Sequence, residues 1–336
     1  MFFEHRSIGH KAGRFSLAPQ VTAAAHGALE KAVLIDFFHE YAFRCARVTM
    51  RPTNDLVFRI GNVALPTCQG AAYAIRVDET GAAAVAENER DLVRAYLTLL
   101  DMIAMDGEGV PYLPFCEVRE SPSVAVRMAH FCFFPDTKLY ELQRFLRVCG
   151  ALKYTHVVLE FWGMLRYACL PQLGWPHACT PDDIRPLLEE ARDLGLETVP
   201  MFNHWGHASG GRVSRGKHVV LCQDPSLQPL FDEHGWCWNI ENPRTRTLLR
   251  AVRQELCDLH GPGAFFHIGC DEAYRFAYSP ENIARISRFI NETADELRKA
   301  GRKTILWGDM LLSQHPEYDP HNLTRPPHRT RTGRGA

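Results

Sequence analysis

Two adjacent carboxylates, Asp271 and Glu272, follow the apolar run Ala264–Cys270, which is typical of a buried strand. Neighbouring side chains on a strand point to opposite faces, but at a strand end the backbone turns and both can reach one cleft. Burial and mutual repulsion should keep one of the pair protonated near neutral pH, as a general acid requires. The alternative is a helix cap or a solvent-facing pair, but the buried strand and Gly269 favour function.

Other side chains suited to sugar chemistry stand at the ends of the other apolar runs. Aromatic faces stack on pyranose rings, while carboxylates and guanidinium groups bind hydroxyls. Beside Asp271 and Glu272 as catalytic residues, the candidate substrate-binding residues are Arg127, His130, Glu160, His207, Trp307 and Asp309. The spacing His204-x-x-His207 also fits a metal, but no third ligand accompanies the pair, so we expect no metal site and no cofactor.

Alternating strands and helices must position these side chains. The apolar runs are Val124–Phe133, Thr155–Phe161, Glu197–Phe202, Ala264–Cys270 and Lys303–Trp307, and the helical patterns between them are Lys138–Cys149, Pro181–Leu194, Thr245–Leu259 and Asn282–Lys299. This alternation predicts an α/β fold with a parallel sheet covered on both faces. Because no Gly-x-Gly-x-x-Gly turn follows the first strand, a TIM-type (β/α) barrel is favoured over a dinucleotide-binding fold.

Five strand–helix units are fewer than the eight of a complete barrel, which usually takes about 250 residues. We therefore expect an incomplete catalytic barrel over residues 124–315 and a disordered basic tail over 319–336. The unpaired edges of its first and fifth strands are templates for association. We accordingly expect weak activity at best and self-association through those edges.

A small α/β domain is expected before the barrel, at residues 1–120. Its expected elements are a helix over Val21–Arg44, strands over Leu56–Ile60 and Tyr73–Val77, a turn over Asp78–Gly81 and an amphipathic helix over Asn88–Met105. The Ser121-Pro122 step marks the end of this domain.

The composition of the 336-residue chain excludes several classes of protein. Lys and Arg total 38 against 39 Asp and Glu, so the net charge of -1 gives no reason to expect nucleic acid as a partner. No apolar run reaches the roughly 18–20 residues of a transmembrane helix, and the N-terminus lacks a secretory pattern. We therefore expect a cytoplasmic protein without a membrane partner. Its 11 scattered cysteines form no Cys-x-x-Cys pair, which favours reduced thiols.

The segment His267–Ala273, His-Ile-Gly-Cys-Asp-Glu-Ala, resembles the His-Ile/Val-Gly-Gly-Asp-Glu signature of glycoside hydrolase family 20, the β-N-acetylhexosaminidases. The segment Trp238–Thr245 resembles the Asn-Pro-x-Thr segment of that family, and Pro200–His207 resembles its Pro-Gly-His strand end. With Glu160 and the run Trp307–Met310, the sequence is most similar to the hexosaminidase D type. The resemblance covers about residues 124–315.

The resemblance implies substrate-assisted, retaining removal of terminal β-linked N-acetylglucosamine or N-acetylgalactosamine from a glycan or glycoconjugate. It implies that Glu272 is the general acid/base, that Asp271 orients the acetamide and that Arg127 grips sugar hydroxyls. The sequence departs from the family pattern at Cys132, where an Asp is common, and at Trp162-Gly163, where further acids are usual.

Two alternatives stay open. The chain could be a truncated remnant that binds sugar with little or no activity. It could also be a two-carboxylate barrel glycosidase in which Glu160 and Glu272 act as acid and nucleophile.

Overall fold

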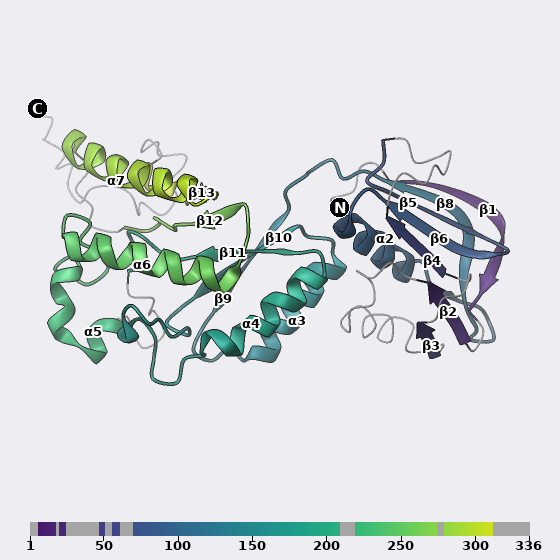
Figure 1. The fold of residues 1–336 in the computed structure, drawn as a ribbon, viewed down its shortest axis with the longest axis horizontal. Helices are drawn as coiled ribbons and strands as arrows, with labels where there is room; N and C mark the ends of the chain where they lie inside the picture. Colours follow the sequence, from purple (N-terminus) through teal and green to yellow (C-terminus); the bar gives the residue numbers. More distant parts are fainter. Residues whose placement is uncertain are drawn as a thin grey trace, which may run out of the picture. The chain divides into compact units, whose positions relative to one another are not determined.

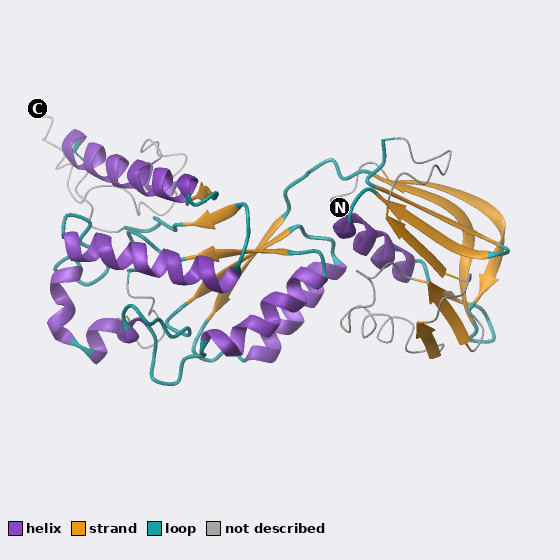
Figure 2. Cartoon of the chain, in the orientation of Figure 1, coloured by secondary structure: helices purple, strands orange, loops and turns teal. Residues whose placement is uncertain are grey.

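The computed structural model describes residues 6–17, 20–24, 47–50, 56–60, 70–208, 219–273 and 279–311. The chain divides into two compact units. The first unit comprises Met1–Ala129, Gln143–Val157 and Leu187–Glu197, and the second comprises His130–Leu142, Val158–Pro186 and Thr198–Ala336. Strands predominate in the N-terminal part of the chain, whereas strands and helices alternate in the C-terminal part (Figures 1 and 2). The expected basic tail lies outside the described residues.

The first unit contains an 8-stranded sheet in the order β1-β8-β5-β6-β4-β2-β3, with β7 pairing β8. The strands are β1 (Arg6–Ser16), β2 (Gln20–Ala24), β3 (Arg47–Met50), β4 (Leu56–Ile60), β5 (Tyr73–Asp78), β6 (Gly81–Ala86), β7 (Ala104–Met105) and β8 (Pro111–Glu120). Helix α2 (Glu89–Asp101) packs against β5 and β6 with an apolar stripe that includes Leu92, Tyr96 and Leu99. The side chain of Asn88 caps it by accepting the Asp91 amide.

Two expected helices of this region differ from the structure. The helix expected over Val21–Arg44 is wrong at its start, where Gln20–Ala24 form β2, and the rest of it lies outside the described residues. The helix expected to reach Met105 ends at Asp101, because Ala104 and Met105 pair with β8 as β7. The expected strands and the turn at residues 78–81 are confirmed as β4 and the antiparallel β5–β6 hairpin.

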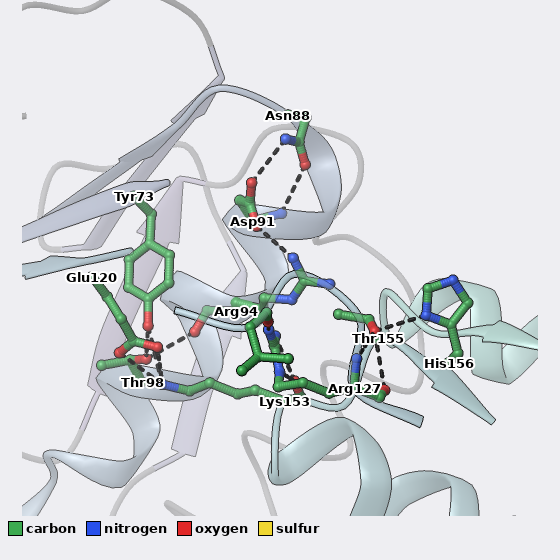
Figure 3. A network of polar contacts seen from close by, with 11 residues as sticks. Tyr73, Asn88, Asp91, Arg94, Thr98, Glu120, Arg127, Lys153, Thr155 and His156 are labelled. Carbon is green, nitrogen blue, oxygen red and sulfur yellow. Dashed lines mark hydrogen bonds and ion pairs between the residues drawn. The ribbon is translucent and has the colours of Figure 1, made fainter. Parts of the chain in front are cut away.

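A buried ion pair lies in the first unit (Figure 3). The Nζ of Lys153 lies 3.1 Å from Oε2 of Glu120 and donates to the hydroxyl of Tyr73 at 3.0 Å. That hydroxyl also bonds Oγ1 of Thr98 at 2.6 Å. Buried charges are costly unless paired and hydrogen-bonded, and here each charged group has partners.

The second sheet has five strands in the order β13-β12-β11-β10-β9, with β12 parallel to both β11 and β13. They are β9 (Met128–Phe133), β10 (His156–Phe161), β11 (Glu197–Met201), β12 (Phe265–His267) and β13 (Lys303–Ile305). The helices between and after them are α3 (Leu139–Ala151), α4 (Pro181–Asp193), α5 (Val219–Gln223), α6 (Pro243–His260) and α7 (Pro280–Lys299), with short 3-10 turns at Pro171–Leu173, Pro225–Leu230 and Asp309–Leu311. The predicted α/β alternation is therefore confirmed.

Local sequence explains these elements. Every residue of β10 and β11 is buried, as expected for central parallel strands covered on both faces. Asn242 and Ser279 cap α6 and α7, and a proline occupies the first turn of each. Among the described residues, no helix combines the length and apolar character needed to cross a membrane.

Candidate active site

The loop that follows β12 holds the two candidate catalytic carboxylates in an unusual backbone conformation. Gly269, Cys270 and Glu272 have φ angles of 66°, 74° and 45°. This left-handed region costs a residue with a side chain roughly 1–2 kcal/mol. Such strain is typical of functional sites, where the surroundings hold it in place.

Two glycines allow neighbouring loops to approach this segment closely. A Cβ at Gly269 would lie 1.8 Å from Oδ1 of Asn203, and a Cβ at Gly206 would lie 2.0 Å from the carbonyl oxygen of Asp271. A side chain at Gly206 would therefore push the backbone of the β12 loop away, whereas one at Gly269 would displace the side chain of Asn203. The sequence motif Trp205-Gly206-His207 thus has a packing reason as well as a chemical one.

Hydrogen bonds fix the backbone of Glu272 from both sides. Its amide donates to Oδ2 of Asp309 at 3.1 Å, and its carbonyl oxygen accepts from Nε1 of Trp236 at 2.6 Å. Asp309 therefore contacts Glu272 directly. Burial raises the pKa of Asp309, and the charge of Asp271 acts in the same direction.

The side chain of His207 links the two carboxylates. Its Nε2 lies 3.3 Å from Oδ2 of Asp271 and 3.2 Å from Oε2 of Glu272. The imidazole is buried, with the rings of Trp236 and Trp162 at 4.7 and 5.3 Å between centroids. The carboxylate side chains are 24% and 32% exposed. Nε2 of His207 therefore contacts both carboxylates. Because both are partly exposed, solvent and a substrate can reach them.

A second group lies on the neighbouring strands β9 and β10. The Nε2 of His130 is 3.2 Å from Oε2 of Glu160 and 3.6 Å from Sγ of Cys132. Glu160 is buried, and its other oxygen accepts from Nδ2 of Asn203 at 2.5 Å. Burial lowers the pKa of His130, but bonding to Cys132 and Glu160 outweighs this and raises the pKa to about 9. His130 is therefore a cation at neutral pH.

An aromatic side chain flanks this group. The indole of Trp307 lies 4.8 Å from the ring of His267 and 5.9 Å from that of His130, and it is 41% exposed. The Nδ1 of His267 accepts the Gly269 amide at 3.0 Å. Burial and the nearby His130 lower the pKa of His267 to about 4, so this ring is neutral. The exposed indole offers a face suited to stacking on a sugar.

Most of the predicted site residues are connected through these contacts in the second unit. They are His130, Glu160, His207, Asp271, Glu272, Trp307 and Asp309. Asn203 and Trp236 were not among the candidates. Asn203 stands beside His204 at the end of β11, which was a usable signal, whereas nothing local marked Trp236.

Arg127 does not join this group. It stands directly before β9, at the amino end of that strand, whereas functional groups gather at the carboxyl ends. Its buried guanidinium donates to the carbonyl oxygens of Lys153 at 3.0 and 2.9 Å and of Val124 at 2.5 Å (Figure 3). The expectation that it grips sugar hydroxyls came from the family resemblance, whereas here the guanidinium is bonded to backbone carbonyls.

The two histidines of the His204-x-x-His207 spacing have different partners. His204 is fully buried, donates from Nδ1 to the carbonyl oxygen of Phe202 at 2.6 Å and accepts at Nε2 from Arg253 at 3.0 Å. Burial, with Arg253 beside it, lowers the pKa of His204 to about 3. His204 is a neutral structural residue, whereas His207 faces the carboxylates.

A hollow of about 670 Å³ lies away from these carboxylates in the second unit, and the residues that line it include Tyr167, Trp175 and Glu255. The carboxylate of Glu255 accepts the amides of Ala168 and Cys169 at 2.8 and 2.6 Å. Glu255 is the one carboxylate among the residues that line the hollow, and its bonds to two backbone amides hold a loop in place.

The comparisons with known proteins agree with the sequence motifs. Residues 176–325 match the family model described as the catalytic domain of glycosyl hydrolase family 20. The chain is 24% identical over 191 residues to hexosaminidase D of Bos taurus, covering 52% of this chain and 52% of that protein. It is 22% identical over 263 residues to a β-N-acetylhexosaminidase of Cellulomonas fimi, covering 71% and 50%.

The fold has solved counterparts. The family 20 exo-β-N-acetylglucosaminidase of Vibrio harveyi, solved with N-acetylglucosamine, has a TM-score of 0.71 and 17% identity, covering 92% of this chain and 54% of that one. The chain spans about half the length of these curated relatives. The resemblance to glycoside hydrolase family 20, including its hexosaminidase D type, is thereby confirmed.

Proposed function

We propose that this chain, with its confirmed resemblance to glycoside hydrolase family 20, removes terminal β-linked N-acetylhexosamine from glycans or glycoconjugates. The observation that carries the proposal is the strained loop after β12, on which Asp271 and Glu272 both contact His207. The names of the relatives, hexosaminidase D and β-N-acetylhexosaminidase, support the same substrate class, N-acetylglucosamine or N-acetylgalactosamine.

In the proposed mechanism the acetamido carbonyl oxygen of the substrate attacks the anomeric carbon while Glu272 protonates the departing glycosidic oxygen. Water then attacks the anomeric carbon of the oxazolinium intermediate and gives a proton back to Glu272, so configuration is retained. The backbone bonds from Asp309 and Trp236 hold Glu272 for both steps.

Asp271 is suited to the acetamide. Among the described residues its Oδ1 is one of the buried polar atoms without a hydrogen-bond partner, while its Oδ2 contacts His207. In the proposal this Oδ1 accepts the acetamide N–H, and the negative charge stabilises the positive charge that develops on the oxazolinium ring.

The remaining side chains are assigned to sugar binding. The exposed face of Trp307 stacks on the ring, and the His130–Glu160 pair bonds hydroxyls. Asp309 acts through Glu272 in this proposal because its Oδ2 already accepts the Glu272 amide. Arg127 has no part in the proposal, because its guanidinium bonds backbone carbonyls.

We further propose that the five strand–helix units form part of a TIM-type (β/α) barrel. In the part of the chain that the structure describes, β9 and β13 pair on one side only, which supports association through these edges. Low turnover of the isolated chain and self-association in size-exclusion chromatography are the expected results, and a monomer with full turnover would refute both. Cytoplasmic localisation stays a prediction.

Paired substrates test the mechanism. Nitrophenyl N-acetyl-β-glucosaminide should be hydrolysed and nitrophenyl β-glucoside should not, because only the first carries the internal nucleophile. Asp271→Asn should lower turnover of the N-acetylated substrate about 10²- to 10³-fold, the usual effect of losing one stabilising group. A thiazoline mimic of the oxazolinium ion should inhibit competitively. Equal hydrolysis of both substrates by the wild type would favour the direct two-carboxylate mechanism instead.

A further inference from the structure

We propose that His130, Cys132 and Glu160 form a binding site for a single divalent cation of the zinc class. Their ligand atoms, Nε2, Sγ and Oε2, come from the neighbouring strands β9 and β10. The donor set of imidazole, thiol and carboxylate is one that zinc and cobalt(II) prefer.

The distances between the three atoms fit one shared ion. A tetrahedral zinc ion with bonds of about 2.3 Å to sulfur and about 2.0 Å to nitrogen or oxygen separates its ligand atoms by roughly 3.3 to 3.5 Å. Here Nε2 and Oε2 are 3.2 Å apart, Sγ and Oε2 are 3.4 Å apart, and Sγ and Nε2 are 3.6 Å apart. An ion could therefore contact all three atoms without moving a side chain.

The arrangement differs from that of a cysteine nucleophile. In a nucleophile–histidine–acid relay, one ring nitrogen faces the nucleophile and the other faces the acid. In this protein the same nitrogen, Nε2 of His130, faces both Cys132 and Glu160. Three atoms that converge on one point suit a cation better than a proton relay.

The surrounding structure holds the ligands. His130 and Cys132 are two residues apart on β9, so both side chains lie on one face of the strand. Asn203 donates to Oε1 of Glu160 and leaves Oε2 directed at the other two ligands. Hydrogen bonds of this kind orient carboxylate ligands in metal sites.

Three protein ligands leave a fourth position for water, as in zinc sites that are not purely structural. Because His130 is a cation at neutral pH, binding would displace two protons to solvent, one from Nε2 of His130 and one from the Cys132 thiol, leaving a neutral imidazole and a thiolate as ligands. Because the proposed function assigns His130 and Glu160 to sugar hydroxyls, an ion at this site should compete with the substrate. That last step rests on the proposed function, whereas ion binding does not.

Cobalt(II) is the probe for the test. Added to the full purified chain, it should bind with a stoichiometry of one and give the charge-transfer band of a cobalt–thiolate bond with the visible bands of four-coordinate cobalt. Zinc(II) should displace it. Cys132→Ser should abolish the charge-transfer band, and Asn203→Ala should weaken affinity about 10- to 100-fold. The exposed thiol of Cys222 provides the control, because Cys222→Ser should leave the spectrum unchanged.

The outcomes separate the two proposals. A wild-type spectrum without the thiolate band, or a band that persists in a folded Cys132→Ser variant, would overturn the metal site. Folding of that variant is checked by its thermal unfolding curve. If cobalt binds but no hexosaminide is hydrolysed, the metal site stands and the proposed function falls. If hexosaminides are hydrolysed, zinc(II) should raise KM without changing kcat.

Discussion

Two polar networks, one in each unit, differ in how completely their groups are satisfied. In the first unit, the Lys153–Glu120 pair is almost fully buried and both charges have protein partners. In the second unit, Asp271 and Glu272 remain partly exposed around His207 on a strained loop. Among the described residues, the buried Oδ1 atoms of Asp271 and Asp309 have no hydrogen-bond partner.

The difference indicates what each network does. A satisfied network stabilises one arrangement of the chain and leaves nothing with which a ligand could bond. Unpaired polar atoms and backbone strain lower stability, so their concentration in one place favours a ligand-binding role. The first network should therefore control folding and the second should control turnover, and variants of each can be compared directly.

The largest loss of turnover is expected when Glu272 is replaced. Glu272→Gln keeps the shape and the backbone bonds to Asp309 and Trp236 but removes the transferable proton. Turnover of the nitrophenyl N-acetyl-β-glucosaminide should fall about 10²- to 10⁴-fold. The unfolding midpoint should stay close to that of the wild type. Unchanged turnover would exclude Glu272 as the general acid/base.

Replacement of Lys153 should instead lower the stability of the folded chain. Lys153→Met should leave the buried carboxylate of Glu120 without its cation and lower the free energy of unfolding by about 3–5 kcal/mol. The matched control is Lys11→Met, because the Lys11–Glu117 pair is exposed and should contribute no more than about 1 kcal/mol. Denaturant titration measures both, and equal effects would remove the contrast between buried and exposed pairs.

The sequence predicted the second sheet better than the first for a physical reason. Buried parallel strands such as β10 and β11 are continuous apolar runs, and the helices between them have clear caps. Strand β8 contains Pro111, Pro114 and several charges, so no such run marks it. Its pairing with the distant β1 and β5 is what fixes it as a strand.

In the candidate site, too, the sequence predicted the residues that local patterns mark and missed those fixed by tertiary contacts. The acids at strand ends were predictable because their positions follow from the strands themselves. The contact of Trp236 with Glu272 joins residues 36 apart through a tertiary approach that no local pattern encodes. The role expected for Arg127 followed from the family resemblance, whereas in the structure its guanidinium bonds the backbone carbonyls of Lys153 and Val124. The contact with Lys153 is a tertiary one that no strand pattern encodes.

The neutral buried histidines should have a smaller effect, on how the free energy of unfolding changes with pH. The pKa of His204 is lowered to about 3 and that of His267 to about 4, both chiefly by burial. A histidine whose pKa is lowered by folding does not change the free energy of unfolding above the unfolded pKa near 6.5, because it is neutral in both states. Below that pH the unfolded state binds the proton more readily, so the folded state loses stability. The free energy of unfolding should therefore decrease below pH 6.5, by at most about 1.4 kcal/mol per pH unit for each histidine.

Denaturant titrations between pH 7 and pH 4 measure this slope. His204→Asn keeps a donor for the Phe202 carbonyl and removes one titrating group, so the slope should become shallower. The control is His234→Asn, at a histidine 41% exposed, which should leave the slope nearly unchanged. Equal slopes in the wild type and both variants would show that His204 is not held neutral.

The smallest changes in stability and turnover are expected for variants of Asp309, where the two quantities should respond differently. Its pKa is raised by burial, so the folded protein favours the protonated carboxyl, and the cost appears as pH rises above the unfolded value of 3.8. Asp309→Asn removes that charge and keeps an oxygen for the Glu272 amide. The free energy of unfolding at pH 7 should rise by no more than about 1 kcal/mol, because solvent screens a half-buried group. This gain should vanish near pH 4.

Turnover distinguishes this positioning role from direct sugar binding. Asp309→Asn should change kcat little, whereas Asp309→Ala leaves the Glu272 amide without its acceptor and should lower kcat about tenfold with KM nearly unchanged, as expected for the loss of one hydrogen bond. A rise in KM in both variants would instead mean that the carboxylate contacts the substrate. In that case Asp309 would be a binding group, as its place at a strand end first suggested, and the backbone of Glu272 would depend on Trp236 for its position.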